Sequence, residues 1–381
     1  MKKLVILGGG ESGVGTALLA KMKGFEVFLS DSGNMKPHLK EELNNAAIRF
    51  EEGGHSEEEI LSADEVVKSP GIPEKAPIIK ALRAKGVKIV SEIEFAARYT
   101  TARKICITGA NGKTTTTLLT HHILKEAGFK AELAGNIGTS LARQIAAGNE
   151  PDWYVIELSS FQLDDMFDFK ADIAILTNIT PDHLDRYDYK FENYIRSKFR
   201  ITQNQTEKEA FIYNADDPVT NEWFPKIHTG GTNYGVTTKG TFTDIFTDNG
   251  VMNVCTRKDN DLIFVADNMT IKGLHNIYNA MQACAAAQLA GVDNDSIAHS
   301  LTTFKNAAHR LEFVATVDGV DYVDDSKATN VDAAWYALEC QKKPVVWIAG
   351  GTDKGNDYSV LNELVHQKVK TLVCLGLDNK K

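Results

Sequence analysis

A lysine and a threonine follow a glycine-containing turn, an arrangement suited to phosphate binding. Residues 104–108 form a short apolar run typical of a buried strand, and Lys113 opens a helical pattern after the turn. The intervening Gly109 and Gly112 would let backbone N–H groups approach a phosphate at the start of that helix. Lys113 would then reach the β- and γ-phosphates, and the Thr114 hydroxyl would bind Mg²⁺.

This pattern departs from the usual phosphate loop at one position. The form GxxxxGK[ST] requires glycine at position 107, where the chain has Ile107. Spacing alone therefore leaves two interpretations open. One is a nucleotide-binding loop, and the other is an ordinary strand-to-helix turn in which Lys113 is a surface residue.

Two further side chains are candidate metal ligands. A predicted strand at residues 153–158 carries Glu157 near its carboxyl end, and parallel sheets bind ligands at that edge. Another predicted strand, at residues 171–179, leads into a loop that holds His183. The alternatives are that Glu157 meets solvent or a helix N-terminus, and that His183 is an ordinary surface histidine.

A lysine on the apolar face of a predicted helix is the third candidate. In the helix expected over residues 191–201, Lys198 lies four residues after Tyr194 and three after Ile195, so it shares their inward face. Burial disfavours the charged ammonium group, which leaves a neutral amine available for chemistry or modification. The alternative is that the stem of Lys198 packs inside while its amine reaches solvent.

A second glycine pattern lies at the N-terminus. Gly8, Gly10 and Gly13 fit GxGxxG after an apolar strand at residues 4–7, and the next strand ends at Asp31. Taken literally, this is a dinucleotide-binding fingerprint with an acidic ribose ligand. The pattern is weak by itself, and a Rossmann-like unit could use the same loop for another phosphorylated ligand or for none.

Composition limits the class of protein. The 381 residues are 43% hydrophobic and 24% charged, as in an ordinary protein of two or three domains. The net charge of −9 comes without a basic cluster, which argues against partners such as nucleic acid or an anionic membrane. Five widely spaced cysteines without a CxxC pair favour free thiols in a reducing compartment. We expect a cytoplasmic protein without a membrane-spanning segment.

Predicted strands and helices alternate along the chain, which indicates an α/β fold. The expected architecture is a Rossmann-like N-terminal domain, a central nucleotide-binding domain with a parallel sheet, and an incomplete Rossmann-like C-terminal domain. A small antiparallel β patch is expected at residues 227–272 of the central domain. The expected domain limits are 1–98, 99–305 and 306–381.

Three motifs resemble the ATP-dependent Mur ligases of peptidoglycan precursor synthesis. The shortened loop at residues 109–114 is similar to the phosphate loop of that family, which accounts for Ile107. The segments 157–163 and 325–330 resemble the branch of the family that adds D-glutamate, because sister enzymes carry other residues at positions 326–328. The resemblance extends along the whole chain.

The resemblance implies particular binding residues. For ATP it implies Gly109, Asn111, Gly112, Lys113, Thr114, Thr115, Asn276, Asn279, Arg310, Asp325 and Lys327. For the substrates UDP-N-acetylmuramoyl-L-alanine and D-glutamate it implies Ser12, Gly13, Asp31, Ser32, Ser69, Pro70, Gly71, Asn136, Ser159, Gln162, His183, Thr329 and Lys354.

The resemblance also implies a mechanism, in which the γ-phosphoryl group of ATP passes to the alanyl carboxylate and the amine of D-glutamate attacks the acyl phosphate. The implied catalytic residues are Lys113, Glu157, His183 and Lys198, and the implied metal ligands are Thr114, Glu157, His183 and Lys198. Two Mg²⁺ ions and a carbamylated Lys198 are expected in a monomer. The C-terminal domain is expected to be shorter than is usual in the family.

Three other functions remain open at this point. A nicotinamide- or flavin-dependent oxidoreductase could be built on residues 8–13, although it would not need the second phosphate loop. A non-catalytic module would bind nucleotide without forming ADP. A sister amino-acid ligase or a folylpolyglutamate synthase would differ from the favoured ligase in its acceptor.

Overall fold

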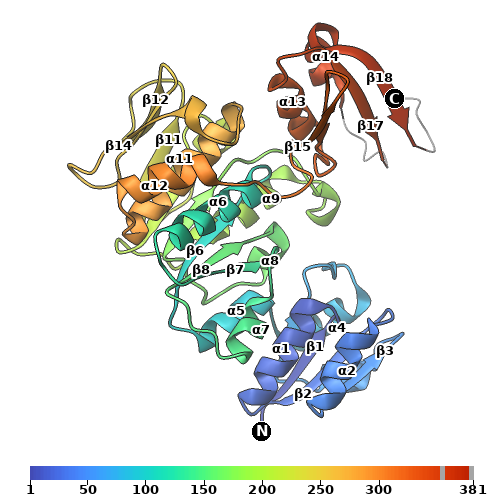
Figure 1. The fold of residues 1–381 in the computed structure, drawn as a ribbon. Helices are drawn as coiled ribbons and strands as arrows, with labels where there is room; N and C mark the ends of the chain where they lie inside the picture. Colours follow the sequence, from blue (N-terminus) through green and yellow to red (C-terminus); the bar gives the residue numbers. More distant parts are fainter. Residues whose placement is uncertain (352–356, 377–381) are drawn as a thin grey trace.

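The computed structural model describes residues 1–351 and 357–376 and arranges them in three groups of elements (Figure 1). The N-terminal group is blue, the central group runs from cyan to orange, and the C-terminal group is red. Lys354, which the resemblance assigns to the substrate site, lies outside the described residues. The domain limits expected from the sequence remain predictions.

The N-terminal domain is a parallel sheet covered by helices on both faces, as the alternating pattern predicts. Its strand order is β3-β2-β1-β4-β5, with bounds Arg49–Glu52, Glu26–Asp31, Lys3–Leu7, Glu65–Lys68 and Lys88–Val90. Its helices are α1 (Glu11–Met22), α2 (Pro37–Asn45), α3 (Glu57–Leu61) and α4 (Pro77–Lys85). The sequence-based prediction did not include α2, β3 and α3, whose segments are mostly polar; α2 buries only Leu39 and Leu43.

The central domain is built on one nine-stranded sheet. Its order is β14-β13-β12-β11-β10-β9-β6-β8-β7, with bounds Leu262–Val265, Val251–Val254, Ile245–Asp248, Thr232–Thr237, Ala210–Asn214, Ile173–Leu176, Arg103–Thr108, Trp153–Glu157 and Ala131–Gly135. The expected β patch at residues 227–272 is not separate, because β11 pairs in parallel with β10 and β12 pairs with β11. Only β12, β13 and β14 pair in antiparallel fashion, and they extend the same sheet.

Helices cover both faces of the central sheet (Figure 1). The α-helices are α5 (Glu92–Ala96), α6 (Lys113–Glu126), α7 (Leu141–Ala146), α8 (Ser160–Asp164), α9 (Phe191–Phe199), α10 (Pro218–Trp223), α11 (Leu274–Ala290) and α12 (Asn294–Thr303). Short 3₁₀ helices span Ala97–Tyr99, Leu184–Arg186, Arg200–Thr202, Phe224–Lys226 and Ala266–Asn268. No described helix is both long enough and apolar enough to cross a membrane.

The C-terminal group contains two small pairs of strands. The hairpin is β15 (Glu312–Val317) with β16 (Val320–Asp324), and the parallel pair is β17 (Val345–Gly350) with β18 (Val369–Leu375). The accompanying helices are α13 (Val331–Glu339), α14 (Asn362–Lys368) and a 3₁₀ turn at Ser359–Leu361.

The N-terminal and central domains share one apolar core. Buried residues of β1, such as Leu4 and Ile6, belong to the same cluster as Cys106 of β6, and Phe95 of α5 lies in that cluster too. Helix α1 also packs on α7, where Arg143 forms an ion pair of 2.7 Å with Glu11. Because apolar contact is continuous between the two sheets, the first domain is held in a defined position relative to the phosphate loop.

A buried carboxyl group in this shared interface gives the first testable prediction. Glu92 of α5 is 5% exposed and accepts a hydrogen bond of 2.6 Å from the backbone N–H of Ala142 in α7. Burial raises the pKa of Glu92 from 4.5 to about 7, and the Ala142 N–H offsets this only in part. The folded state therefore binds this proton more tightly than the unfolded state. Its contribution makes the free energy of unfolding fall between pH 4.5 and about 7.

We expect Glu92→Gln to remove this pH dependence, because glutamine keeps an acceptor for Ala142 and carries no charge. The free energy of unfolding of the variant minus that of the wild type should be about 2 kcal/mol larger at about pH 8 than at about pH 5. Urea unfolding at both pH values measures this difference, and the exposed Glu41→Gln is the control. An equal difference from the wild type at both pH values would contradict the buried ionisation.

Candidate active site

The phosphate loop connects β6 to α6 in a shape that requires glycine. Gly109 has φ +149° and Gly112 has φ +85°. A Cβ atom at Gly109 would lie 1.9 Å from Thr177 Oγ1, and one at Gly112 would lie 2.3 Å from Asn279 Oδ1. Neither contact is possible, so the neighbouring strand and helix approach the loop closely only because both residues lack a side chain.

Lys113 begins α6 and folds back over the loop. Its Nζ atom donates hydrogen bonds to the carbonyl oxygens of Gly109 at 2.9 Å and Ala110 at 2.8 Å. Burial lowers the pKa of Lys113, and the negative charges of Glu157 and Asp182 oppose that change. The half-buried ammonium group therefore lies among carboxylates at the helix N-terminus, where a phosphate group would also be attracted.

Asn111 is held in place by three neighbours. Its backbone N–H donates to Asn178 Oδ1 at 2.9 Å, and its carbonyl oxygen accepts from Asn178 Nδ2 at 3.0 Å and from Thr177 Oγ1 at 2.6 Å. Its side chain contacts the C-terminal part of the chain, because Asn330 Nδ2 donates to Asn111 Oδ1 at 2.9 Å. The loop therefore links the central sheet to the segment that follows β16.

Glu157 ends β8 with one carboxylate oxygen unsatisfied. The side chain is 1% exposed, and its Oε1 atom accepts a hydrogen bond of 2.8 Å from Asn136 Nδ2. Its buried Oε2 atom has no hydrogen-bond partner among the described residues. A buried, unpartnered carboxylate oxygen is costly unless a cation or donor completes it, so the site fits a divalent ion.

Lys198 of α9 points inward, as the helical spacing predicts, and its amine does not reach solvent. It is 2% exposed, and its Nζ atom donates to the Gly109 carbonyl at 2.8 Å and to Thr108 Oγ1 at 3.2 Å. Burial, followed by the positive charge of Lys113, lowers the pKa of Lys198 well below its usual value. Both effects shift the equilibrium of Lys198 toward the neutral amine.

His183 faces the same space from the loop after β9. Its backbone is left-handed (φ 51°), and its Nε2 atom lies 3.5 Å from Asp182 Oδ2. Its ring meets Phe161 edge-on at a centroid distance of 5.2 Å. The side chain is half exposed, so it could contact a ligand directly.

A pocket of about 300 Å³ brings together residues from the N-terminal and central domains. Seven of the expected site residues line it: Pro70, Gly71, Lys113, Asn136, Ser159, His183 and Lys198. Ser160, Phe161, Asp182, Arg186 and Tyr194 complete its wall.

A second pocket of about 540 Å³ also borders the phosphate loop. It collects most of the residues expected to bind ATP, namely Asn111, Gly112, Thr115, Asn276, Asn279, Arg310 and Asp325. Asn279 Nδ2 donates to Asn276 Oδ1 at 3.1 Å, which agrees with the predicted shared helix face. The two pockets meet at the loop, because Lys113 lines one and Gly112 the other.

Other expected site residues lie outside these two linings, and their roles remain predictions. They are Ser12, Gly13, Asp31, Ser32, Ser69, Gly109, Thr114, Glu157, Gln162, Lys327 and Thr329. Asp31 accepts hydrogen bonds from the N–H groups of Gly9 and Gly33, so it shapes the first glycine loop. Gln162 closes a capping box with Ser159 at the start of α8.

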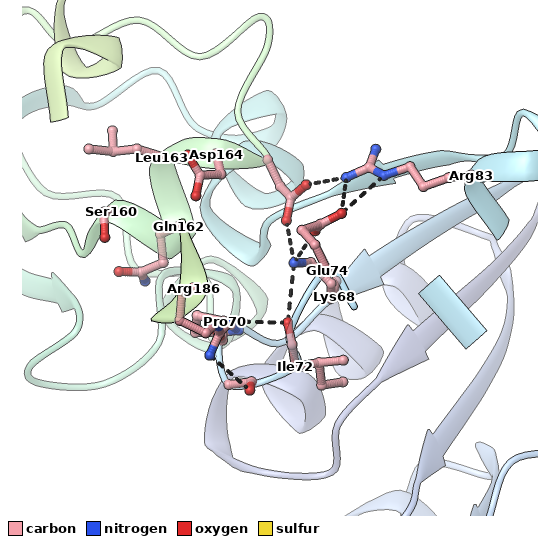
Figure 2. Close-up of polar contacts among 12 residues, drawn as sticks. Lys68, Pro70, Ile72, Glu74, Arg83, Ser160, Gln162, Leu163, Asp164 and Arg186 are labelled. Carbon is pink, nitrogen blue, oxygen red and sulfur yellow. Dashed lines mark hydrogen bonds and ion pairs between the residues drawn. The ribbon is translucent and has the colours of Figure 1, made fainter. Parts of the chain in front are cut away.

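Several residues at this site and beside it were not expected from the sequence. They include Phe161 and Arg186 in the pocket wall, and Lys68 and Asp165 in the adjoining domain interface. Figure 2 labels Arg186 and Lys68. Asp165 lies in no recognisable motif. Arg186 could have been found, since it follows His183 by three residues in the same loop.

Comparison with protein families covers the first two domains. Residues 2–91 match the model described as Mur ligase MurD-like, N-terminal domain. Residues 107–287 match the model described as Mur ligase middle domain.

Curated relatives match the whole chain. The UDP-N-acetylmuramoylalanine–D-glutamate ligase of Bacteroides fragilis is 52% identical over 389 residues, which cover 100% of this chain and 85% of the relative. The ligase of the same name from Cytophaga hutchinsonii is 53% identical over 384 residues, with the same coverage.

Solved structures of low identity show the same fold. MurF from Acinetobacter baumannii gives a TM-score of 0.62 at 17% identity and covers 98% of this chain and 80% of its own. UDP-N-acetylmuramate-alanine ligase MurC from Thermotoga maritima gives 0.59 at 18% identity and covers 98% and 90%. From the two family models and the full-length relatives, the chain belongs to the Mur ligase family.

Proposed function

We propose that this chain is an ATP-dependent ligase that joins D-glutamate to UDP-N-acetylmuramoyl-L-alanine. The observation that carries the proposal is that two pockets border one phosphate loop, the smaller at Lys113 and the larger at Asn111, Gly112 and Thr115. Such a geometry suits a reaction in which a nucleotide on one side activates a carboxylate on the other. The choice of substrates is supported by relatives that carry this activity in their name and match 100% of the chain.

In this proposal, ATP occupies the larger pocket. Its adenosine lies near Asn276 and Asn279 of α11, and its phosphates lie along the loop from Asn111 to Thr115. Arg310 and Asp325 line this pocket from the segments around β15 and β16. Lys327, Thr329 and Lys354 are proposed to approach as the C-terminal domain closes and excludes water from the acyl phosphate.

UDP-N-acetylmuramoyl-L-alanine is proposed to bind across the N-terminal domain and the smaller pocket. Its UDP part would contact the first glycine loop around Ser12 and Gly13 and the turn at Asp31 and Ser32, and its alanyl end would reach Asn136 and His183. The γ-phosphoryl group would pass to the alanyl carboxylate, and the D-glutamate amine would then displace phosphate. Lys113 would neutralise charge as the two anions approach.

Mg²⁺ fits the site because Glu157 Oε2 is buried and unpartnered among the described residues. Thr114, Glu157, His183 and Lys198 are the proposed ligands of two ions. When bound, Mg²⁺ supplies charge neutralisation for the transferring phosphoryl group.

Lys198 is proposed to become a ligand by carbamylation. Its neutral Nζ atom would form a bond to the carbon of CO₂, one N–H proton would leave to solvent, and a carbamate anion would result. Burial beside Lys113 favours the neutral amine that this step needs. The negative carbamate would then sit near the positive Lys113 group.

An acceptor screen tests the proposed function. Release of phosphate from MgATP is expected only when UDP-N-acetylmuramoyl-L-alanine and D-glutamate are both present. The proposed enzyme is cytoplasmic and monomeric. Turnover with another amino acid instead of D-glutamate would indicate a sister ligase, and turnover with a folate acceptor would indicate a folylpolyglutamate synthase.

A further inference from the structure

The loop at residues 69–74 of the N-terminal domain contacts the central domain through its backbone carbonyl groups. Arg186 Nη2 donates to the Pro70 carbonyl at 3.1 Å and to the Ile72 carbonyl at 3.3 Å, and Nη1 donates to the Gly71 carbonyl at 3.4 Å (Figure 2). The guanidinium also lies 4.3 Å from the ring centroid of Phe161. One cation of the central domain therefore binds three successive carbonyls of the other domain.

A second cation contacts the same loop from within the N-terminal domain. Lys68 at the end of β4 is 3% exposed, and its Nζ atom donates to the Ile72 carbonyl at 3.3 Å. The same Nζ atom forms ion pairs with Glu74 at 2.7 Å and with Asp165 of the central domain at 2.9 Å (Figure 2). Asp165 is also buried and pairs with Arg83 at 2.8 Å. The Ile72 carbonyl is thus shared by cations that are both tied to the central domain.

These contacts determine which way the amide groups of the loop point. A peptide group is planar and trans, so a carbonyl fixed on Arg186 directs the following N–H to the opposite side. Binding of the Pro70 carbonyl therefore orients the N–H of Gly71, and both residues line the smaller pocket. Ser69 packs against the first glycine loop, because a Cβ atom at Gly8 would lie 2.7 Å from Ser69 Cβ.

We propose that Arg186 and the buried Lys68–Asp165 pair are positioning residues, which hold the 69–74 loop so that its Gly71 N–H receives the UDP-linked substrate at the required place relative to the phosphate loop. The proposal rests on the proposed function for the identity of that substrate. Lys68 and Asp165 do not line the smaller pocket, so they act on the substrate through the loop. Arg186 does line that pocket, and its guanidinium donates to all three loop carbonyls.

Arg186→Ala is expected to lose affinity for the UDP-linked substrate and to keep its affinity for MgATP. Calorimetry should show the dissociation constant for UDP-N-acetylmuramoyl-L-alanine rising about tenfold or more, because charged hydrogen bonds to the loop are lost. Arg186→Lys should lie between this variant and the wild type, since one ammonium group cannot reproduce the three-carbonyl contact. The dissociation constant for MgATP should change less than about twofold, because the larger pocket is untouched.

A matched control comes from another cation at the same interface. Lys88 of the N-terminal domain pairs with Asp168 of the central domain at 3.4 Å, and it does not contact the 69–74 loop. Lys88→Ala should therefore leave both dissociation constants unchanged. Asp165→Asn should weaken binding of the UDP-linked substrate, as Arg186→Ala does. In the double variant with both Arg186→Ala and Asp165→Asn, the dissociation constant should rise by less than the product of the two single increases, because both residues act through one loop.

Hydrogen exchange provides a readout that needs no substrate. Peptides covering residues 69–74 should exchange faster in Arg186→Ala and Asp165→Asn than in the wild type or Lys88→Ala. Unchanged hydrogen exchange of residues 69–74 in the two variants would overturn the positioning role. Equal weakening of the binding of UDP-N-acetylmuramoyl-L-alanine and of MgATP would overturn it as well. Failure of the wild type to bind the UDP-linked substrate would instead overturn the proposed function, and the exchange result would still decide whether Arg186 holds the loop.

Discussion

Replacing Lys113 with alanine is expected to reduce ADP formation about a thousandfold or more. The Lys113 ammonium group lies at the start of α6, within hydrogen-bond distance of the Gly109 and Ala110 carbonyls, and it lines the pocket that also contains His183. Its charge would stabilise the phosphoryl group as it approaches the alanyl carboxylate. A coupled assay of ADP release in the presence of both proposed substrates measures the loss.

Lys125→Ala is the matched control for this prediction, because Lys125 lies in the last turn of the same helix and is exposed. It should retain the activity of the wild type. Normal turnover in Lys113→Ala would contradict the assignment of the loop to phosphoryl transfer. A comparable loss in both lysine variants would point to a general effect on α6 instead.

Lys198→Ala is expected to lose activity about a hundredfold or more and to regain part of it when short carboxylic acids are added. The alanine variant lacks the proposed carbamate, and a small carboxylate could enter the space left by the buried side chain and supply the missing negative charge. Initial rates with and without acetate measure the rescue. Carbon-13 NMR after equilibration with labelled CO₂ should show a carbamate signal in the wild type that the variant lacks.

The control for this experiment is Lys190→Ala, which removes an exposed lysine at the start of the same helix. That variant should keep both its activity and the carbamate signal. Full activity of Lys198→Ala without any added carboxylate would contradict the carbamate ligand. A wild type without the labelled signal would contradict it as well.

Sequence spacing predicted the local geometry of the site well. The position of Glu157 at a strand end follows from the apolar run that precedes it, and that of Lys198 on a buried helix face follows from the period of 3.6 residues. The structure has both features. The pairing of Asn276 with Asn279 follows from their spacing along α11 in the same way. These features are local, so a single stretch of sequence contains the information.

Residue spacing could not predict the contacts between domains. Arg186 and Pro70 are separated by 116 positions, and Lys68 and Asp165 lie in different domains. Nothing in the periodicity of either segment specifies that they meet. The pairing direction of β11 and β12 was missed for a related reason, since strand neighbours depend on the packing of the whole sheet.

Calorimetric titration with UDP-N-acetylmuramoyl-L-alanine, with NADH as the comparison ligand, distinguishes the ligase from an oxidoreductase. The proposed site of the UDP-linked substrate is formed by the first two domains. The glycine loop of the first domain also fits a dinucleotide pattern. We expect the UDP-linked substrate to bind and NADH not to bind. Binding of NADH alone, unaffected by MgATP, would contradict the ligase assignment and make the first glycine loop the nucleotide site of an oxidoreductase.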